Sequence, residues 1–490
     1  MPRLTIDGKA VDAPAGASVL EAAGLAGVSI PTLCHAPGVR ALTSCMICVV
    51  EERGSGRTVP ACATIVEEGM IIETNTTAIR NARREVLQLL LSEHAGDCEA
   101  PCRRACPASM DIPLMLRRIA KGDMDTAARI AARDLVLPAT LGCVCEAPCE
   151  TACRRAGLDE AVSIRALHRA VAEAAHGMRL DCQPSTGKRV AVIGAGPAGL
   201  GAAVALRRFG HGCCVYEKRA HAGGALRDMP ESRLPRAILE MEIDAIRRMD
   251  VAFRFGVDVG AAIPLTSLVN EHDAVIVASG GIEAQGEAVF AAPEHRMTVR
   301  AIAAGKRAAE AAHRRIALGG SAEPAKPYDA HLGRLEPEQL ERYAGNRVAP
   351  EALARSRQSE NLRGEAGRCL HCDCHAPVSC KLRQYATEYG ARPATYRAPA
   401  RPEVGVTQRH GGVLFDPGKC IKCGLCVEIT HQSGEALGLT FVGRGFATRV
   451  AVPFNESIEA ALRVSAEACV AACPTGALAF ADTEERRPCE

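Results

Sequence analysis

The sequence predicts a multidomain protein of mixed α+β and α/β class. Three observations carry this prediction: a length of 490 residues, groups of cysteines spread along the chain, and an apolar strand followed by a glycine-rich turn near residue 194. A chain of this length exceeds one ordinary hydrophobic core. We expect six consecutive segments, with the boundaries 1–93, 94–187, 188–318, 319–362, 363–395 and 396–490.

The composition limits the classes of function. A net charge of +2 and 3% aromatic residues with no tryptophan argue against a nucleic-acid surface. No apolar run of about 18 residues predicts a membrane span, and the N-terminus lacks the pattern of a secretory signal, so we expect a cytoplasmic protein. The 24 cysteines are clustered, and in a reducing compartment this favours metal ligation over disulfides. Iron–sulfur clusters are the preferred interpretation, with zinc as the alternative.

The first segment, 1–93, is predicted to be a β-grasp-like ferredoxin domain. Two short strands are expected on either side of Asp7-Gly8, and a helix from about Ser18. Four cysteines with the spacing C-x10-C-x2-C-x13-C suit a [2Fe–2S] cluster, because each of its two irons takes two thiolates. These cysteines are Cys34, Cys45, Cys48 and Cys62. This start resembles the iron–sulfur subunit of respiratory complex I and that of iron hydrogenases.

The second segment, 94–187, combines two cysteine-rich loops with a helical pattern between them. The loops are "SEHAGDCEAPCRRAC" (92–106) and "GCVCEAPCETAC" (142–153). We expect amphipathic helices to close these loops around two [4Fe–4S] clusters. The motifs resemble the N-terminal domain of the glutamate synthase small subunit and of dihydropyrimidine dehydrogenase.

Carried over by position, this resemblance implies two interleaved sets of ligands. One set is His94, Cys98, Cys102 and Cys153. The other is Cys106, Cys145, Cys149 and His168, where the family has glutamine or glutamate in place of the histidine. Imidazole in place of a thiolate removes one negative charge and raises the reduction potential of a cluster. The alternative for His168 is an ordinary helix residue.

The third segment, 188–318, begins with a strand, a glycine-rich turn, a helix and a strand that ends at Glu217. Gly194, Gly196 and Gly199 form the pattern G-x-G-x-x-G, which lets a pyrophosphate approach the backbone at a helix N-terminus. Glu217 is placed to accept hydrogen bonds from ribose hydroxyls. The pattern therefore predicts a Rossmann-like domain with a bound dinucleotide.

FAD is expected as this dinucleotide, because the following residues resemble the flavin segment of the glutamate synthase-type family. In that family the elements GG-x-L and R-L-P line the isoalloxazine, which implies such roles for Gly224, Leu226 and Arg233. The Gly-Asp that binds the ribityl chain is replaced by Pro293-Glu294, so Glu294 is the expected substitute. The alternative is a scaffold domain that binds no flavin.

The stretch "DAVIVASGGIEAQGEAVFAAP" (273–293) predicts that one domain of this family is missing. The family inserts a complete NADPH-binding domain after the first apolar strand and then returns to the flavin domain. Only a few residues separate Gly281 from the return strand at Val289, whereas a Rossmann half needs on the order of 100 residues. We therefore expect no direct binding of NAD(P)H.

Residues 319–362 are predicted to be a linker with short helices. Segment 363–395 then carries the compact pattern C-x2-C-x-C-x5-C, formed by Cys369, Cys372, Cys374 and Cys380. Such a loop can supply four thiolates to one [4Fe–4S] cluster or to one structural zinc.

The last segment, 396–490, is predicted to be a ferredoxin-like [4Fe–4S] domain. It resembles the two-cluster ferredoxin segment of molybdenum formate dehydrogenases and iron hydrogenases. The resemblance implies one cluster held by Cys420, Cys423, Cys426 and Cys473. Thr430 stands where the second cluster would need a cysteine, so one cluster is expected and Cys469 is predicted to be a buried thiol.

Together these motifs predict an electron-transfer iron–sulfur flavoprotein with one [2Fe–2S] cluster, three to four [4Fe–4S] clusters and FAD. No pattern for an organic substrate site is readable. We expect a non-catalytic subunit of a multi-subunit oxidoreductase, similar to formate dehydrogenase or hydrogenase complexes, with other subunits or a ferredoxin as partners. Splitting of electron pairs at FAD is a further hypothesis. The alternatives are a ferredoxin-dependent flavoenzyme that reduces a small substrate, and a redox-sensing scaffold.

Overall fold

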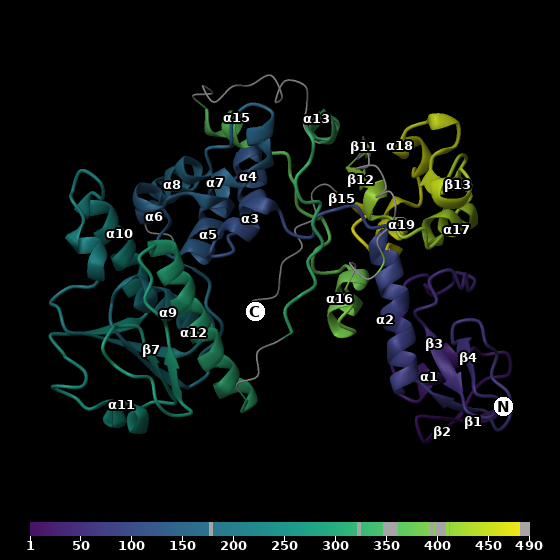
Figure 1. Ribbon diagram of the computed structural model, residues 1–490, viewed down its shortest axis with the longest axis horizontal. Coiled ribbons are helices and arrows are strands. Elements are labelled where there is room, and N and C mark those ends of the chain that lie inside the picture. Colours follow the sequence, from purple (N-terminus) through teal and green to yellow (C-terminus); the bar gives the residue numbers. More distant parts are fainter. Residues whose placement is uncertain are drawn as a thin grey trace. The chain divides into compact units, whose positions relative to one another are not determined.

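The chain divides into two compact units in a computed structural model (Figure 1). Unit 1 comprises Met1–Glu99, Ala325–Arg347 and Asp373–Glu490, and unit 2 comprises Ala100–Pro324 and Val348–Cys372. The structure describes residues 1–175, 180–320, 325–345, 361–392, 396, 408–410 and 412–480. The N-terminal and C-terminal segments therefore belong to one unit, and the segment predicted at 363–395 is divided after Cys372.

Unit 1 begins with a five-stranded sheet in the order β2-β1-β5-β3-β4. Its strands are β1 (Arg3–Ile6), β2 (Lys9–Asp12), β3 (Val49–Glu52), β4 (Arg57–Pro60) and β5 (Ile71–Glu73). The predicted turn at Asp7-Gly8 joins β1 to β2, and both residues have positive φ. Helix α1 (Val19–Leu25) begins after Ser18, as predicted. The Ser18 hydroxyl accepts from the Glu21 N–H, and the Glu21 carboxylate accepts from the Ser18 N–H, which is a capping box.

Helix α2 (Thr77–Ser92) ties the N-terminal sheet to the later part of unit 1. It buries Leu87 and Leu91, and it packs against α16 (Lys381–Glu388). The Arg83 guanidinium is buried; it donates to the Val49 carbonyl at 2.8 Å and to the Tyr389 hydroxyl at 3.0 Å. Segments about 300 residues apart in sequence thus share one core.

The rest of unit 1 is built from short elements. Its sheets are β11-β12-β15 and β13-β14, formed by β11 (Gln408–His410), β12 (Val413–Phe415), β13 (Thr440–Val442), β14 (Arg449–Ala451) and β15 (Leu478–Phe480). Its helices are α13 (Pro337–Gly345), α17 (Leu425–Gln432), α18 (Ile458–Ala461) and α19 (Ala466–Ala472). One apolar core, which includes Phe415, Leu425 and Cys469, holds the sheets and the last three helices together.

Unit 2 begins with a helical part. Its helices are α3 (Pro101–Ala105), α4 (Ile112–Lys121), α5 (Met124–Leu135), α6 (Pro138–Val144), α7 (Pro148–Thr151), α8 (Ile164–Ala174) and α15 (Leu362–Ala366). The helical pattern predicted between the two cysteine-rich loops is interrupted at residues 122–123. Gly122 ends α4 in the left-handed conformation, and Asp123 caps α5. Much of the predicted linker 319–362 lies outside the described residues.

The remainder of unit 2 is a parallel sheet in the order β10-β9-β6-β7-β8. The strands are β6 (Arg189–Ile193), β7 (Gly212–Glu217), β8 (Val251–Phe255), β9 (Ala274–Val277) and β10 (Val289–Ala291), and the helices are α9 (Pro197–Arg208), α10 (Arg236–Arg247), α11 (Leu265–Glu271) and α12 (Thr298–Leu318). Strand β10 pairs in parallel with β9, and residues 278–288 connect them without a helix or strand. The return strand predicted from the sequence is therefore present and follows β9 directly.

Helices α9 and α12 lie side by side (Figure 1). A Cβ atom on Gly305 would overlap the Ala198 carbonyl, so this close contact requires glycine. The longest described helix, α12, has 21 residues. No helix within the described ranges is long and apolar enough to cross a membrane.

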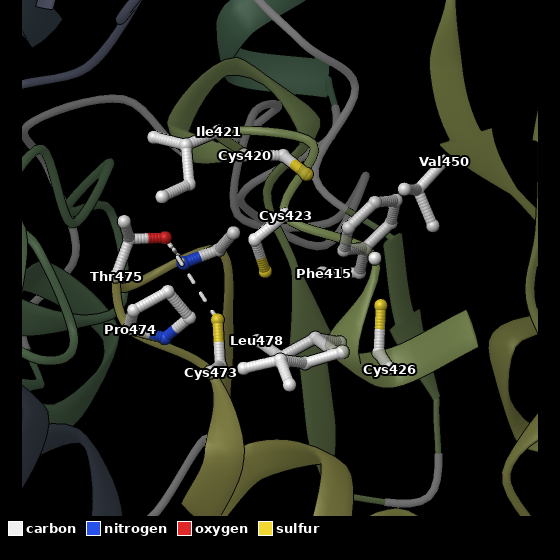
Figure 2. Close-up of a pocket in the computed structure, with 13 residues that line it drawn as sticks. Phe415, Cys420, Ile421, Cys423, Cys426, Val450, Cys473, Pro474, Thr475 and Leu478 are labelled. Carbon is white, nitrogen blue, oxygen red and sulfur yellow. Dashed lines mark hydrogen bonds between the residues drawn. The ribbon is translucent and has the colours of Figure 1, made fainter. Parts of the chain in front are cut away.

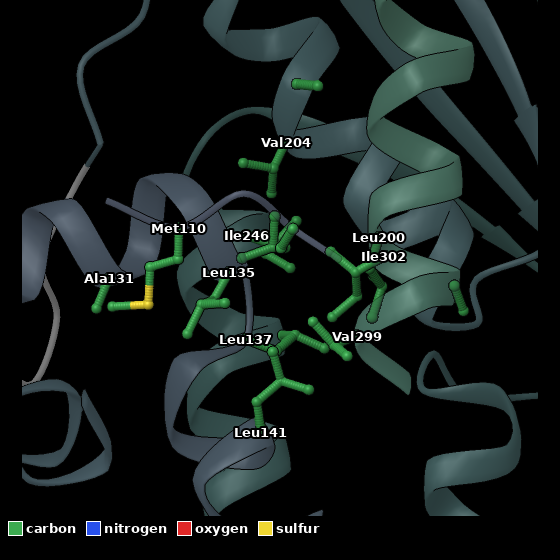
Figure 3. Packing of buried hydrophobic residues seen from close by; sticks show 14 of the residues in the cluster. Met110, Ala131, Leu135, Leu137, Leu141, Leu200, Val204, Ile246, Val299 and Ile302 are labelled. Atoms are coloured by element: carbon green, nitrogen blue, oxygen red, sulfur yellow. The ribbon is translucent and has the colours of Figure 1, made fainter. Parts of the chain in front are cut away.

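One apolar core joins the helical part of unit 2 to the parallel sheet (Figure 3). Leu135 and Leu137 belong to this core together with Leu200 of α9 and Ile302 of α12. The buried Glu242 of α10 adds a polar link, because its carboxylate accepts from the first free N–H groups of α6, at 2.7 and 2.8 Å. Burial raises the pKa of Glu242 to about 7.

Candidate iron–sulfur and dinucleotide sites

The four cysteines predicted for a [2Fe–2S] cluster converge in unit 1. Cys48 Sγ lies 3.4 Å from Cys62 Sγ, and the Cys45 N–H donates to Cys34 Sγ at 3.5 Å. All four are buried. A hydrogen bond from the Cys45 thiol lowers the pKa of Cys34 to about 5, while the same bond raises the pKa of Cys45. Met46, which lies between Cys45 and Cys48, has a positive φ of 50°, a conformation that few residues other than glycine adopt.

Cys420, Cys423, Cys426 and Cys473 surround a second pocket of unit 1 (Figure 2). Apolar side chains, among them Phe415 and Leu478, fill the rest of its wall. Burial raises the pKa of Cys420 to about 11 and that of Cys423 to about 12. Cys469 does not line the pocket; it is fully buried, and its thiol lies 3.8 Å from the Cys426 carbonyl.

In unit 2, Cys106, Cys145, Cys149 and His168 line one apolar pocket, as the second implied set requires. The His168 Nδ1 lies 3.0 Å from the Pro138 carbonyl, so Nδ1 carries the proton and Nε2 keeps its lone pair. Burial lowers the pKa of His168 to about 4. The imidazole is therefore neutral at pH 7, which is the form that binds metal.

The residues of the first implied set are divided between the two units. Cys102 and Cys153 line a pocket of unit 2 with Cys369 and Cys372, whereas His94 and Cys98 belong to unit 1. Burial raises the pKa of Cys102 well above its ordinary value, and the charges of four nearby thiols raise it further. Sequence reasoning missed this grouping. Two sequence features could have revealed it: no C-x2-C pair stands before Cys102, and a C-x2-C pair stands at 369–372.

Cys98, Cys374 and Cys380 are neighbours in unit 1. The Cys374 N–H donates to the Cys98 carbonyl at 3.3 Å, and the Ala330 N–H donates to Cys98 Sγ at 3.4 Å. Burial raises the pKa of Cys380 to about 12, and the charges of Cys374 and Cys98 act in the same direction. His94 is half-buried; its Nδ1 atom is itself buried and has no hydrogen-bond partner among the described residues.

The cysteine groups share their donor chemistry and, in three cases, an apolar pocket. No three His, Cys, Asp or Glu side chains in the described residues converge as they would around one ion. All the groups present soft sulfur donors, and backbone N–H groups donate to Cys98, Cys145, Cys369 and Cys420. Thiols with raised pKa values stay protonated in an apolar pocket, so binding of iron would release protons.

The glycine-rich turn of unit 2 has the shape that a pyrophosphate needs. Gly194 has a φ of 99°, and a Cβ on Gly199 would overlap the Gly194 carbonyl. At Gly196 the space is open, since an added Cβ would meet only the Gly224 Cα, at 3.9 Å. A phosphate can therefore approach the backbone at the start of α9.

Two carboxylates flank this turn at the carboxyl ends of the strands. Glu217 ends β7 and accepts from the Ala195 N–H at 2.7 Å and the Arg219 N–H at 2.8 Å. The Glu294 carboxylate contacts Gly280, just after β9. Of the other predicted residues, Leu226 is buried in the core and Arg233 is exposed.

Comparison with protein families matches three consecutive parts of the chain. Residues 2–77 match the 2Fe-2S iron-sulfur cluster binding domain, and residues 71–180 match dihydropyrimidine dehydrogenase domain II, 4Fe-4S cluster. The chain contains both kinds of iron–sulfur domain. Residues 192–247 match an NAD(P)-binding Rossmann-like domain, a description that does not decide between a flavin and a nicotinamide.

Several curated proteins resemble part of the chain. The NADP(+)-dependent formate dehydrogenase subunit beta of Moorella thermoacetica is 37% identical over 37% of this chain and 29% of its own length. The NAD-dependent dihydropyrimidine dehydrogenase subunit PreT of Escherichia coli is 38% identical over 41% of this chain and 52% of its own length. The NADPH-Fe(3+) oxidoreductase subunit beta of Geobacter sulfurreducens is 37% identical over 37% of this chain and 28% of its own length. The chain thus spans about half the length of these relatives or less.

Proposed function

We propose that the chain is an electron-transfer subunit of a multi-subunit oxidoreductase. The observation that carries this proposal is the adjacency of its cysteine groups inside each unit. In unit 1, Cys34 and Cys380 belong to one apolar cluster against which Cys423 packs. These three residues come from three different cysteine groups, so three redox centres would share one core.

Unit 2 has a similar arrangement. The charge of Cys149, from the group with His168, acts on Cys102 of the neighbouring group. Val299, at the start of α12, lines the pocket with His168, and Glu294 lies just before that helix. Two cysteine groups of unit 2 are thus neighbours, and the helix that follows Glu294 borders one of them.

Iron–sulfur clusters bound at these groups would supply one-electron transfer. The chain contributes cysteine sulfurs and the neutral imidazole of His168 as ligands, an apolar pocket lining, and N–H groups directed at the sulfurs. No disulfide occurs in the described residues, which supports a reducing compartment such as the cytoplasm.

The names of the relatives support a partner that performs the chemistry. Each is called a subunit of an oxidoreductase, and one is a subunit of a formate dehydrogenase. We propose a formate dehydrogenase- or hydrogenase-like catalytic subunit as the partner. The test is anaerobic purification of the tagged chain from its native cells, followed by addition of the substrate of each co-purified subunit. Bleaching of the visible cluster absorbance by such a substrate is expected, and turnover of that substrate by the isolated chain would contradict the proposal.

We propose FAD as the dinucleotide, since the short 278–288 connection leaves no second nucleotide-binding half after β9. The Rossmann-like match is described as NAD(P)-binding, so nicotinamide is the competing ligand. Denaturation of the anaerobically purified chain should release about one FAD per chain. Release of NAD(P), or bleaching of the isolated chain by NADPH alone, would contradict the proposal.

A further inference from the structure

The loop 369–380, here called the cysteine loop, does not gather its four cysteines around one centre. Its first two cysteines line the unit 2 pocket with Cys102 and Cys153. Its last two lie in unit 1, where they neighbour Cys98. The division between the units falls inside the loop, between residues 372 and 373.

We infer that the cysteine loop supplies two ligands to each of two [4Fe–4S] clusters and holds no cluster of its own. This inference rests on the proposal that the cysteine groups bind iron–sulfur clusters. The unit 2 cluster is held by Cys102, Cys153, Cys369 and Cys372. The unit 1 cluster is held by Cys98, Cys374, Cys380 and His94.

Unit 2 anchors the first half of the loop firmly. The Arg368 guanidinium is fully buried and pairs with Glu365 at 2.8 Å and with Asp159 at 3.1 Å. The Arg155 guanidinium, also buried, donates to the Arg368 carbonyl at 3.2 Å. Because Arg155 and Asp159 closely follow Cys153, this network fixes the residue before Cys369 to the segment that carries Cys153.

The pocket itself is suited to a cluster. Apolar side chains of Leu116, Val162 and Ile164 line it between the four cysteines. The His371 N–H donates to Cys369 Sγ at 3.4 Å. Hydrogen bonds of this kind to the sulfurs are part of the surroundings of an iron–sulfur cluster. Four soft sulfur donors thus face one water-poor space.

Unit 1 anchors the second half of the loop equally well. Cys380 caps α16 by accepting from the Arg383 N–H at 3.4 Å, and the Arg383 guanidinium pairs with Glu99 at 2.9 Å. Glu99 directly follows Cys98, so this ion pair holds Cys380 close to Cys98. His94 precedes Cys98 by four residues and offers a buried Nδ1 without a partner, which completes a set of four donors.

Along the chain only Asp373 separates the two pairs of ligands. The cysteine loop is therefore the shortest covalent link between a cluster of unit 2 and a cluster of unit 1.

The test compares two double variants, Cys369→Ser/Cys372→Ser and Cys374→Ser/Cys380→Ser, in the full chain purified anaerobically. Each should lose about four iron atoms per chain. In low-temperature EPR of the dithionite-reduced chain, the first should lose the same signal as Cys102→Ser, and the second the same signal as Cys98→Ser. The matched control is Cys143→Ser/Cys469→Ser, two cysteines that line none of the cysteine pockets; it should keep all iron.

The [2Fe–2S] signal, which persists at higher temperature, reports that each variant has folded. If both double variants remove one and the same signal, and Cys102→Ser removes another, the loop holds its own cluster and the inference is overturned. Loss of stoichiometric zinc with unchanged EPR overturns it as well. A wild-type chain without iron would instead defeat the proposed function itself.

Discussion

Individual side chains decide the charge at each proposed cluster. His168 is held by the Pro138 carbonyl and is neutral at pH 7, so it presents an uncharged donor beside three thiols. A thiolate in its place would add one negative charge to the cluster. More negative charge makes the gain of an electron harder, which lowers the reduction potential.

We therefore predict that His168→Cys retains the iron but lowers the potential of one cluster. EPR-monitored redox titration measures this potential. His272→Cys is the control, because its Nδ1 also lies 3.0 Å from a backbone carbonyl but it lines no cysteine pocket. Unchanged potentials in His168→Cys would show that His168 is an ordinary helix residue.

Gly476 is a second residue whose size matters. An added Cβ would overlap Cys374 Sγ, so Gly476→Ala should displace that sulfur and alter or remove the EPR signal lost in Cys98→Ser. Gly24→Ala in α1 meets nothing within 4 Å and should leave every signal intact. An unaltered EPR spectrum in Gly476→Ala would show that Cys374 is not a ligand of that cluster.

At the scale of elements, the buried Glu242 links α10 to the start of α6. Its pKa in the folded chain, about 7, lies above the ordinary value of 4.5. Between these values the folded chain holds more protons than the unfolded chain. The free energy of unfolding must therefore fall as the pH rises from 4.5 to 7, by on the order of 3 kcal/mol for this group.

Glu242→Gln should remove this contribution. Thermal unfolding of unit 2 across pH 4.5–7, followed by calorimetry of the full chain, should show a smaller fall of the melting temperature in the variant than in the wild type. Equal slopes for the two chains would mean that Glu242 is already ionised throughout this range.

The contact between α9 and α12 gives a second prediction at this scale. Gly305→Ala forces an overlap with the Ala198 carbonyl and should destabilise the nucleotide domain by about 1–3 kcal/mol, with loss of bound dinucleotide. Gly320→Ala, which meets nothing within 4 Å, should bind the dinucleotide normally. Full dinucleotide content in Gly305→Ala would show that the helices can separate at little cost.

At the scale of the whole molecule, local sequence patterns predicted several secondary-structure elements correctly. The capping residue Ser18, the end of β7 at Glu217 and the direct return to β10 follow from sequence features only a few residues long. The grouping of Cys102 with Cys369 could not be predicted in this way, because residues more than 250 positions apart in sequence form no local pattern. The compact spacing of the cysteine loop predicted a single site, whereas the fold divides the loop between two units.

The account depends on clusters at every cysteine group, and iron analysis of the anaerobically purified chain tests this most directly. One [2Fe–2S] cluster and four [4Fe–4S] clusters require about 18 iron atoms per chain and an equal amount of acid-labile sulfide. That content, without stoichiometric zinc, is the predicted result. A colourless chain that contains no iron, or one that holds zinc in its cysteine groups, would contradict the account.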